Sequence, residues 1–169
     1  DAHCDTWTSH FDEPSGHGTW VYEAVNEGLI SAAHTAQIGI RSAAEVETTR
    51  FIENRGGKMI SARSLRGVDR QSDLAKIANE IRDLMGSKPV YLTVDIDCLD
   101  PAFAPGTGTP EPGGLTSSQL LGLLEELSII SFVGMDLTEV APAYDWAELT
   151  SNAAAHAVWT YLSGQMQHW

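Results

Sequence analysis

Carboxylate side chains cluster at the end of an apolar strand predicted at residues 90–96. Asp95, Asp97 and Asp100 stand at or just beyond the end of this run. Because residues two apart in an extended chain share a face, Asp95 and Asp97 are expected to point the same way. Two carboxylates this close raise each other's pKa unless a cation lies between them. The pair therefore indicates a metal site, although a lone Asp-x-Asp is more often a turn or a helix cap.

A second group of ligand-type side chains opens the chain. Asp1, His3 and Asp5 would share one face of an extended segment. Carboxylate oxygens with one imidazole suit Mn²⁺ better than Zn²⁺ or Fe²⁺, and the set lacks the thiolates of a structural zinc site. Shared carboxylates favour two metal ions about 3.5–4 Å apart over one. The candidate metal ligands are Asp1, His3, Asp5, Asp95 and Asp97.

Alternating strands and helices must position these residues. Apolar, β-rich runs predict strands at 36–40, 58–62, 90–96 and 130–137. Apolar periodicity and capping residues predict helices at 43–54, at 72–85, after a capping box at 116–119, and from Asp145 to about residue 162. Continuous apolar strands separated by helices are typical of a parallel sheet covered on both faces. We therefore predict one α/β domain over residues 1–169, with its site at the carboxyl ends of the strands.

Composition and charge argue against several classes of partner. A hydrophobic fraction of 43% fits a globular domain, and a net charge of −13 argues against a nucleic-acid partner. No apolar run approaches the roughly 20 residues of a membrane span. Cys4 and Cys98 make no disulfide framework, so a reducing, cytoplasmic compartment is expected. Since the chain begins inside a motif and without Met, we expect the natural N-terminus to lie upstream.

Three motifs resemble those of the ureohydrolases, the family of arginase and agmatinase. They are Asp-Ala-His-Cys-Asp at 1–5, Asp-Ile-Asp-Cys-Leu-Asp-Pro at 95–101 with Pro-Gly-Thr-Gly-Thr-Pro at 105–110, and Gly-Met-Asp-Leu-Thr-Glu-Val-Ala-Pro at 134–142. The resemblance extends over nearly the whole chain. It implies a three-layer, arginase/deacetylase-like α/β fold with a central parallel sheet and a bridged pair of Mn²⁺ ions. This chain would be the C-terminal portion of that fold, with the N-terminal part missing.

The resemblance also implies roles for individual residues. All the candidate ligands named above fall on family ligand positions, while a sixth ligand, a His in a Gly-Gly-Asp-His motif, would lie upstream of this sequence. His17 matches the family's proton-transfer histidine. His10 lies in the same loop and could be mistaken for it, but it is not expected to transfer the proton. Glu139 matches the guanidinium-binding glutamate, since a carboxylate accepts two parallel hydrogen bonds from a guanidinium. Asp97 is also expected to accept a hydrogen bond from the nucleophile.

The implied reaction is manganese-dependent hydrolysis of agmatine to urea and putrescine by a metal-bridging hydroxide. Agmatinase resembles the chain more than arginase does, because Ser42 stands where arginases place an Asp for the substrate α-amino group. Glu111 departs from some agmatinases, which have an apolar residue there. The implied partners are a small cationic guanidino substrate and further copies of the chain, in a trimer or hexamer by family analogy, with neither nucleic acid nor membrane.

Three alternatives remain open. The first keeps the chemistry but changes the substrate to guanidinobutyrate, arginine or another guanidino compound. The second is a binding module in which Asp95, Asp97 and Asp100 hold Ca²⁺, against which His3 counts because Ca²⁺ prefers oxygen ligands. The third is a non-catalytic metal-binding fragment, suggested by the missing sixth ligand.

Overall fold

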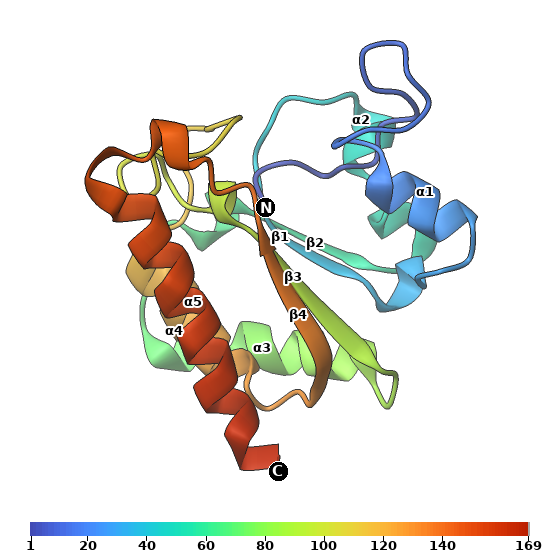
Figure 1. The fold of residues 1–169 in the computed structure, drawn as a ribbon. Helices are drawn as coiled ribbons and strands as arrows, with labels where there is room; N and C mark the ends of the chain where they lie inside the picture. Colours follow the sequence, from blue (N-terminus) through green and yellow to red (C-terminus); the bar gives the residue numbers. More distant parts are fainter. Residues whose placement is uncertain (169) are drawn as a thin grey trace.

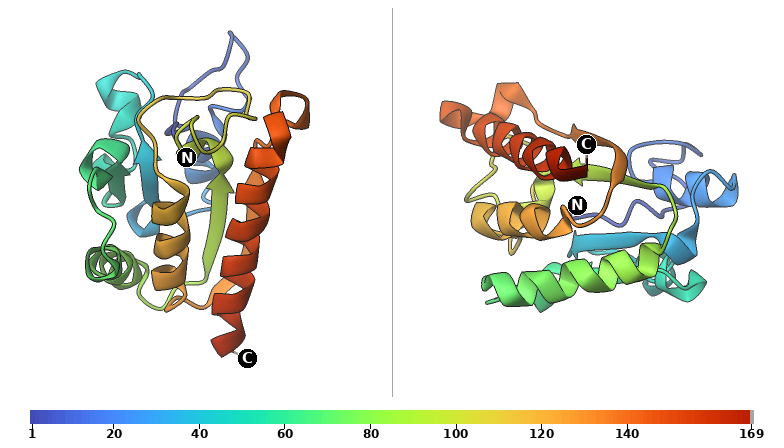
Figure 2. Two further views of the ribbon diagram at one scale, coloured as in Figure 1. Left: turned by 90° about the vertical axis from the view of Figure 1, so that its left-hand side faces the viewer. Right: turned by 90° about the horizontal axis from the view of Figure 1, so that it is seen from below.

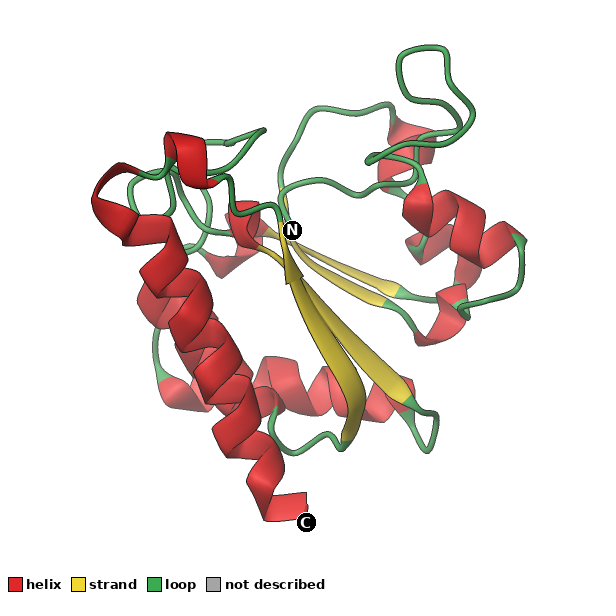
Figure 3. Ribbon diagram, in the orientation of Figure 1, coloured by secondary structure: helices red, strands yellow, loops and turns green. Residues whose placement is uncertain are grey.

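The computed structural model describes residues 1–168 and places its strands in two parallel pairs (Figure 1). β1 (Ala36–Ile40) pairs with β2 (Lys58–Ser61), and β3 (Val90–Asp95) pairs with β4 (Phe132–Thr138). The carboxyl ends of the strands converge near the start of the chain, where long loops gather (Figure 3). The prediction of an α/β fold with parallel strands is confirmed. Among the described residues, however, the two pairs are separate sheets rather than one continuous sheet.

The strands lie close to their predicted positions, and the end of β3 matters most. The strand was expected to run to residue 96, but it ends at Asp95. There the chain enters a 3-10 turn, Ile96–Cys98, and the Asp97 N–H donates to the Asp95 carboxylate at 3.0 Å. A side chain that caps its own following turn stops the extended backbone, because it offers the N–H an alternative to a strand partner.

Three long helices supply half of the residues of the main core cluster. α3 (Gln71–Met85), α4 (Ser117–Leu127) and α5 (Leu149–Gln165) follow one another in space, with α4 in contact with both neighbours (Figure 2). The apolar period predicted for α3 is confirmed, since its buried positions are Leu74, Ala78, Ile81 and Met85. The capping box before α4 is also present. Within the described residues, none of the helices combines the length and apolar character that crossing a bilayer requires.

The prediction of a helix at 43–54 is wrong for most of that segment. Only α2 (Val46–Thr49) and a 3-10 turn at Glu53–Arg55 form there. The β-branched residues of α2 have weak helix propensity, so tertiary packing decides the path of this segment. A helix that the sequence did not reveal, α1 (Trp20–Asn26), lies beside α2, away from α5 (Figure 1).

A cleft of about 650 Å³ separates the two strand pairs. Residues 36–38 of β1 line one wall and residues 90–94 of β3 line the other. The start of the chain closes the cleft at the carboxyl ends of the strands. There the Asp1 amino group donates to the Ile38 carbonyl at 3.1 Å, and the Arg41 N–H donates to the Ala2 carbonyl at 2.9 Å.

Arg41 ties the two strand pairs together at this same end. Arg41 directly follows β1, and its side chain donates to backbone carbonyls of β1 itself, of the turn after β3 and of the loop beyond that turn. The acceptors are the carbonyl oxygens of Gly39, Asp97, Cys98, Leu99 and Glu111. The position of the acidic turn after β3 is therefore fixed relative to β1 by one guanidinium.

The Asp145 side chain caps the first turn of the last helix, as predicted, although it lies four residues before the first helical residue. Its carboxylate accepts hydrogen bonds from the Ser151 hydroxyl at 2.7 Å, the Ser151 N–H at 2.9 Å and the Thr150 N–H at 2.8 Å. Led by the Ser151 hydroxyl, these bonds lower the pKa of Asp145 to about 2. The helix itself starts at Leu149 and runs to Gln165, beyond the predicted end.

Replacing Asp145 with alanine is expected to give a stability loss that depends on pH. The folded-state pKa is about 2 and the unfolded pKa is near 4, so the unfolded chain binds the proton more readily. The contribution of the carboxylate is therefore complete above about pH 4 and fades as the pH falls toward 2. Urea unfolding of both proteins across this range measures it, with the exposed Asp83→Ala as control. A wild-type advantage that stays constant down to pH 2 would contradict the prediction.

Candidate active site

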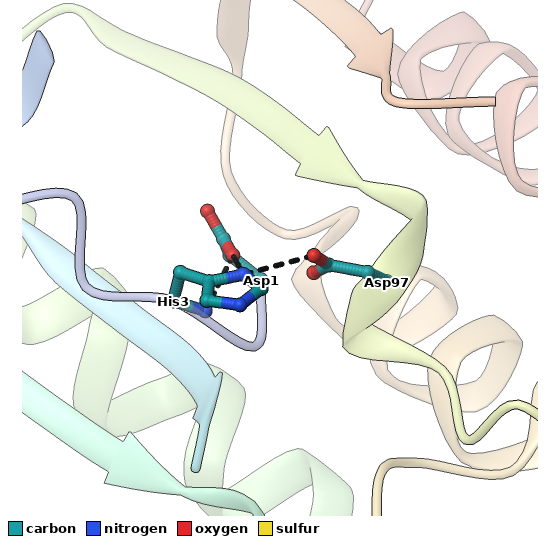
Figure 4. Close-up of side chains that lie close together, drawn as sticks. All are labelled: Asp1, His3 and Asp97. Carbon is teal, nitrogen blue, oxygen red and sulfur yellow. Dashed lines mark hydrogen bonds and ion pairs between the residues drawn. The ribbon is translucent and has the colours of Figure 1, made fainter. Parts of the chain in front are cut away.

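Asp1, His3 and Asp97 bring their ligand atoms together within 4.8 Å of one another. His3 Nδ1 lies 2.9 Å from Asp97 Oδ2 and 3.6 Å from Asp1 Oδ1, with the imidazole between the two carboxylates (Figure 4). The hydrogen bond to Asp97 raises the pKa of His3. Burial alone would raise the pKa of Asp97, but hydrogen bonds from His3 and the Ala2 N–H outweigh it and leave that pKa below its usual range. These residues form the most compact part of the candidate metal site.

Asp95 lies beside this group and lines the same cavity as Asp97. Burial, followed by the charge of Asp97, raises the pKa of Asp95 to about 7. The two carboxylates face one cavity as predicted, but the reason given for it is wrong. Asp97 lies in the 3-10 turn rather than on the extended strand, and its N–H donates to Asp95.

Asp5 also lines this cavity, outside the compact group formed by Asp1, His3 and Asp97. Its backbone is left-handed, with φ of 53°, so the segment from Asp1 is not extended to its end. Burial raises the pKa of the Asp5 carboxyl. Its Oδ2 accepts a hydrogen bond of 2.7 Å from the indole N–H of Trp20.

His17 and Glu139 form a pair that lines the same cavity. His17 Nδ1 lies 3.1 Å from Glu139 Oε1, although the residues are far apart in the chain. Glu139 directly follows β4 and has a left-handed backbone with φ of 64°. Such a conformation is unfavourable for a residue with a side chain and is concentrated at functional sites.

The cavity that these side chains share, apart from Asp1, which lines the cleft between the strand pairs, has a volume of about 950 Å³ and an acidic lining. Its carboxylates are Asp5, Asp95, Asp97, Asp136 and Glu139. Among the residues described, neither Lys nor Arg lines it, while His3, His10 and His17 do. Carboxylates held together in this way favour a bound cation.

The model of the arginase family matches residues 1–163 of the sequence. The chain belongs to the arginase family. Its predicted similarity to the ureohydrolases is therefore confirmed.

Relatives within the arginase family extend this result. The chain is 47% identical over 158 residues to an agmatinase of Chromobacterium violaceum, covering 92% of this chain and 45% of that protein. A crystal structure of a hypothetical agmatinase from Burkholderia thailandensis matches with a TM-score of 0.85 and 40% identity, over 99% of this chain and 50% of that one. The proclavaminate amidino hydrolase from Streptomyces clavuligerus matches with a TM-score of 0.87 and 36% identity, over 98% and 54% of the two chains.

These matches confirm the predicted arginase-type fold. The chain spans about half the length of the relatives that it matches. The relatives carry different names, so membership of the arginase family leaves the substrate to be argued from the cavity.

His10 has a supporting place in this arginase-family site. Its Nδ1 accepts a hydrogen bond of 3.2 Å from the Gly18 N–H. Its ring also lies against Gly16, where an added Cβ would come within 3.0 Å of His10 Cβ. His10 therefore holds the loop that presents His17, and the sequence offered no signal for that contact.

Asp100 faces its own loop rather than the candidate metal ligands. Its carboxylate accepts hydrogen bonds from the N–H groups of Ala102 at 2.9 Å, Gly113 at 2.7 Å and Gly114 at 3.2 Å. These bonds close the base of the Pro- and Gly-rich loop that follows β3. This argues against the alternative of a calcium-binding module, because backbone N–H groups occupy the Asp100 carboxylate that was expected to bind Ca²⁺.

Two residues of this arginase-family site were not predicted from the sequence as functional. Arg41 holds the backbone of the acidic turn, and Trp20 holds the Asp5 carboxylate. Trp20 directly follows the Gly-His-Gly-Thr segment at 16–19, which is a positional signal. Arg41 directly follows a predicted strand, but nothing local indicates that it reaches residues 97–111.

Proposed function

We propose that the natural protein is a manganese-dependent ureohydrolase that converts agmatine to urea and putrescine. The observation that carries the proposal is a single cavity lined both by the candidate ligands His3, Asp5, Asp95 and Asp97 and by the hydrogen-bonded His17–Glu139 pair. The agmatinases among the relatives support the substrate. By family analogy the natural protein would form a homo-oligomer, a trimer or a hexamer.

The donor set fits a divalent cation. Asp1, His3 and Asp97 already place oxygen and nitrogen atoms close together, and Asp5 and Asp95 line the same cavity. We propose all of them as ligands, because hard oxygens with one imidazole suit Mn²⁺. The raised pKa of Asp95 supports this assignment, since a bound cation stabilises the charged form of a buried carboxylate. When bound, Mn²⁺ lowers the pKa of water toward neutrality, which makes hydroxide available.

Glu139 is proposed to orient the substrate. A carboxylate accepts two parallel N–H bonds from a guanidinium, which fixes both its position and its plane. In the free protein one Glu139 oxygen is engaged by His17 at 3.1 Å. A guanidinium that takes both oxygens would therefore release His17 next to the nitrogen that must leave.

His17 is proposed to move the proton. It is 83% exposed at its side chain and lies on a loop flanked by glycines, so its imidazole can reach both solvent and substrate. The oxygen of water bonds to the guanidinium carbon while the bond from that carbon to the alkyl-substituted nitrogen breaks. Both water protons end on the departing amine, one of them passed by His17, so that urea and a protonated amine leave. Asp97 would accept a hydrogen bond from the attacking oxygen.

The lining of the cavity favours agmatine over substrates that carry a carboxylate. Arginine and guanidinobutyrate would bring a negative group into an acidic cavity lined by neither Lys nor Arg among the described residues. Ser42, which lines the cavity, offers no carboxylate for an amino-acid head. A buried charge without a partner is strongly disfavoured.

A substrate panel tests the proposal. With Mn²⁺ present, kcat/KM for urea release is expected to be highest for agmatine. It should be at least about tenfold lower for arginine and guanidinobutyrate, which corresponds to ~1.4 kcal/mol. Chelation should abolish the activity, and Ca²⁺ should not restore it. Equal or better turnover of arginine would refute the substrate assignment, and chelator-resistant urea release would refute the metal.

A further inference from the structure

Trp20 is shared by the active-site cavity and the cleft between the strand pairs, and it donates a hydrogen bond to one residue of the acidic site. Its indole N–H donates to Asp5 Oδ2 over 2.7 Å. Within residues 1–168 this is the single side-chain hydrogen bond that the Asp5 carboxylate receives.

The backbone of Asp5 is held from the same side. The Asp5 carbonyl accepts the N–H of Val21 at 3.1 Å and that of Tyr22 at 3.3 Å. Asp5 has a left-handed backbone, which is unfavourable for a residue with a side chain unless its surroundings stabilise it. The first turn of α1 supplies those surroundings, so the conformation of Asp5 depends on the segment that begins with Trp20.

The same segment carries the His17 loop. Thr19 is buried, and its hydroxyl accepts the Gly16 N–H at 2.8 Å and donates to the Gly16 carbonyl at 3.0 Å. Trp20 follows it directly. The residue that contacts Asp5 is therefore attached to a turn closed by hydrogen bonds, and these bonds help to place its indole N–H.

We infer that Trp20 is a positioning residue that holds the Asp5 carboxylate in the orientation needed to bind a metal ion. A donor bonded to one carboxylate oxygen fixes the rotamer and leaves the second oxygen for the ion, which is how partners behind metal ligands increase affinity. The inference rests on the proposed function, because it takes Asp5 to be a ligand. Beyond the proposed function, it states that Trp20 affects the affinity for the metal ion only by orienting Asp5.

The test replaces Trp20 with phenylalanine, which keeps an aromatic ring and removes the N–H. Mn²⁺ binding by the natural protein is titrated without substrate, from the electron paramagnetic resonance signal of free Mn²⁺. Trp20→Phe is expected to weaken binding by about tenfold or more, the scale seen for partners of metal ligands. Trp159→Phe is the matched control, since Trp159 is 70% exposed on α5, and its affinity should equal that of the wild type.

Two further proteins separate this inference from the proposed function. Asp5→Ala should weaken Mn²⁺ binding, and adding Trp20→Phe to it should have no additional effect, because the positioned group is gone. If Asp5→Ala weakens binding while Trp20→Phe matches the Trp159→Phe control, the positioning role is overturned and the metal site stands. If the double variant binds more weakly than Asp5→Ala, Trp20 does not act through Asp5. If Asp5→Ala binds like the wild type, the ligand assignment in the proposed function fails.

Discussion

Replacing Asp97 with alanine is expected to lower Mn²⁺-dependent urea release by at least about 10²–10³-fold, the effect of removing one preorganised electrostatic group. Asp97 is 1% exposed and is bonded on both oxygens, by His3 at 2.9 Å and by the Ala2 N–H at 2.8 Å. Its loss removes a proposed ligand, the partner of a second ligand and the acceptor for the attacking oxygen. Steady-state kinetics with agmatine and bound Mn²⁺ per subunit measure the two parts of the effect.

The matched control for this substitution is Asp83→Ala, on the exposed surface of α3. It removes a carboxylate of the same size at a place remote from the cavity and should leave kcat unchanged. Normal turnover and normal metal content in Asp97→Ala would rule out the role given to Asp97. Lost turnover with full metal content would restrict that role to the chemistry.

Replacing Arg41 with alanine is expected to lower the free energy of unfolding by about 3 kcal/mol or more, because hydrogen bonds from a charged donor contribute about 1.5–3 kcal/mol each. The guanidinium bonds the Asp97 carbonyl at 2.8 Å and the Glu111 carbonyl at 2.5 Å, among others. Removing it leaves several partly buried carbonyls without a donor at the junction of the strand pairs. Urea unfolding of the natural protein measures the loss.

Arg82→Ala is the control for the Arg41 prediction. Arg82 is exposed and bonds the side chain of its neighbour Asp83 at 2.9 Å, so its removal should change stability by no more than about 0.5 kcal/mol. Arg41→Lys should recover only part of the loss, since an ammonium lacks the planar fork that reaches several carbonyls. Equal stability of the two alanine variants would show that the Arg41 network is dispensable.

The sequence predicted the parts of the site that are local. Ligand-type residues at alternate positions, as in Asp1 and His3, and an acidic strand end, as in Asp95 and Asp97, are visible in the chain itself. The structure brings Asp1, His3 and Asp97 together because the start of the chain is hydrogen-bonded both to β1, at the Ile38 carbonyl, and to the turn after β3, at the Asp97 carboxylate. Asp5 and Asp95 line the cavity, and the role of all five residues as metal ligands stays a prediction.

What the sequence did not predict depends on contacts between distant segments. Arg41 reaches carbonyls 56 to 70 residues away, and Trp20 reaches Asp5 across a loop. Neither contact leaves a periodic or compositional pattern. The helix wrongly predicted at 43–54 has the same origin, because Phe51 and Ile52 are buried in a cluster with Val21 and Ala32. Such packing against distant residues overrides helix propensity.

The cleft between β1 and β3 has a practical consequence for handling the molecule. Along most of its length, the facing backbone groups of the two strands have no ladder partner among the described residues, and the walls are largely apolar. Open strand edges are templates on which an extended segment of another molecule can add. Residues 1–169 by themselves are therefore expected to aggregate at high concentration. A protein in which a further segment of chain covers these strand edges would not.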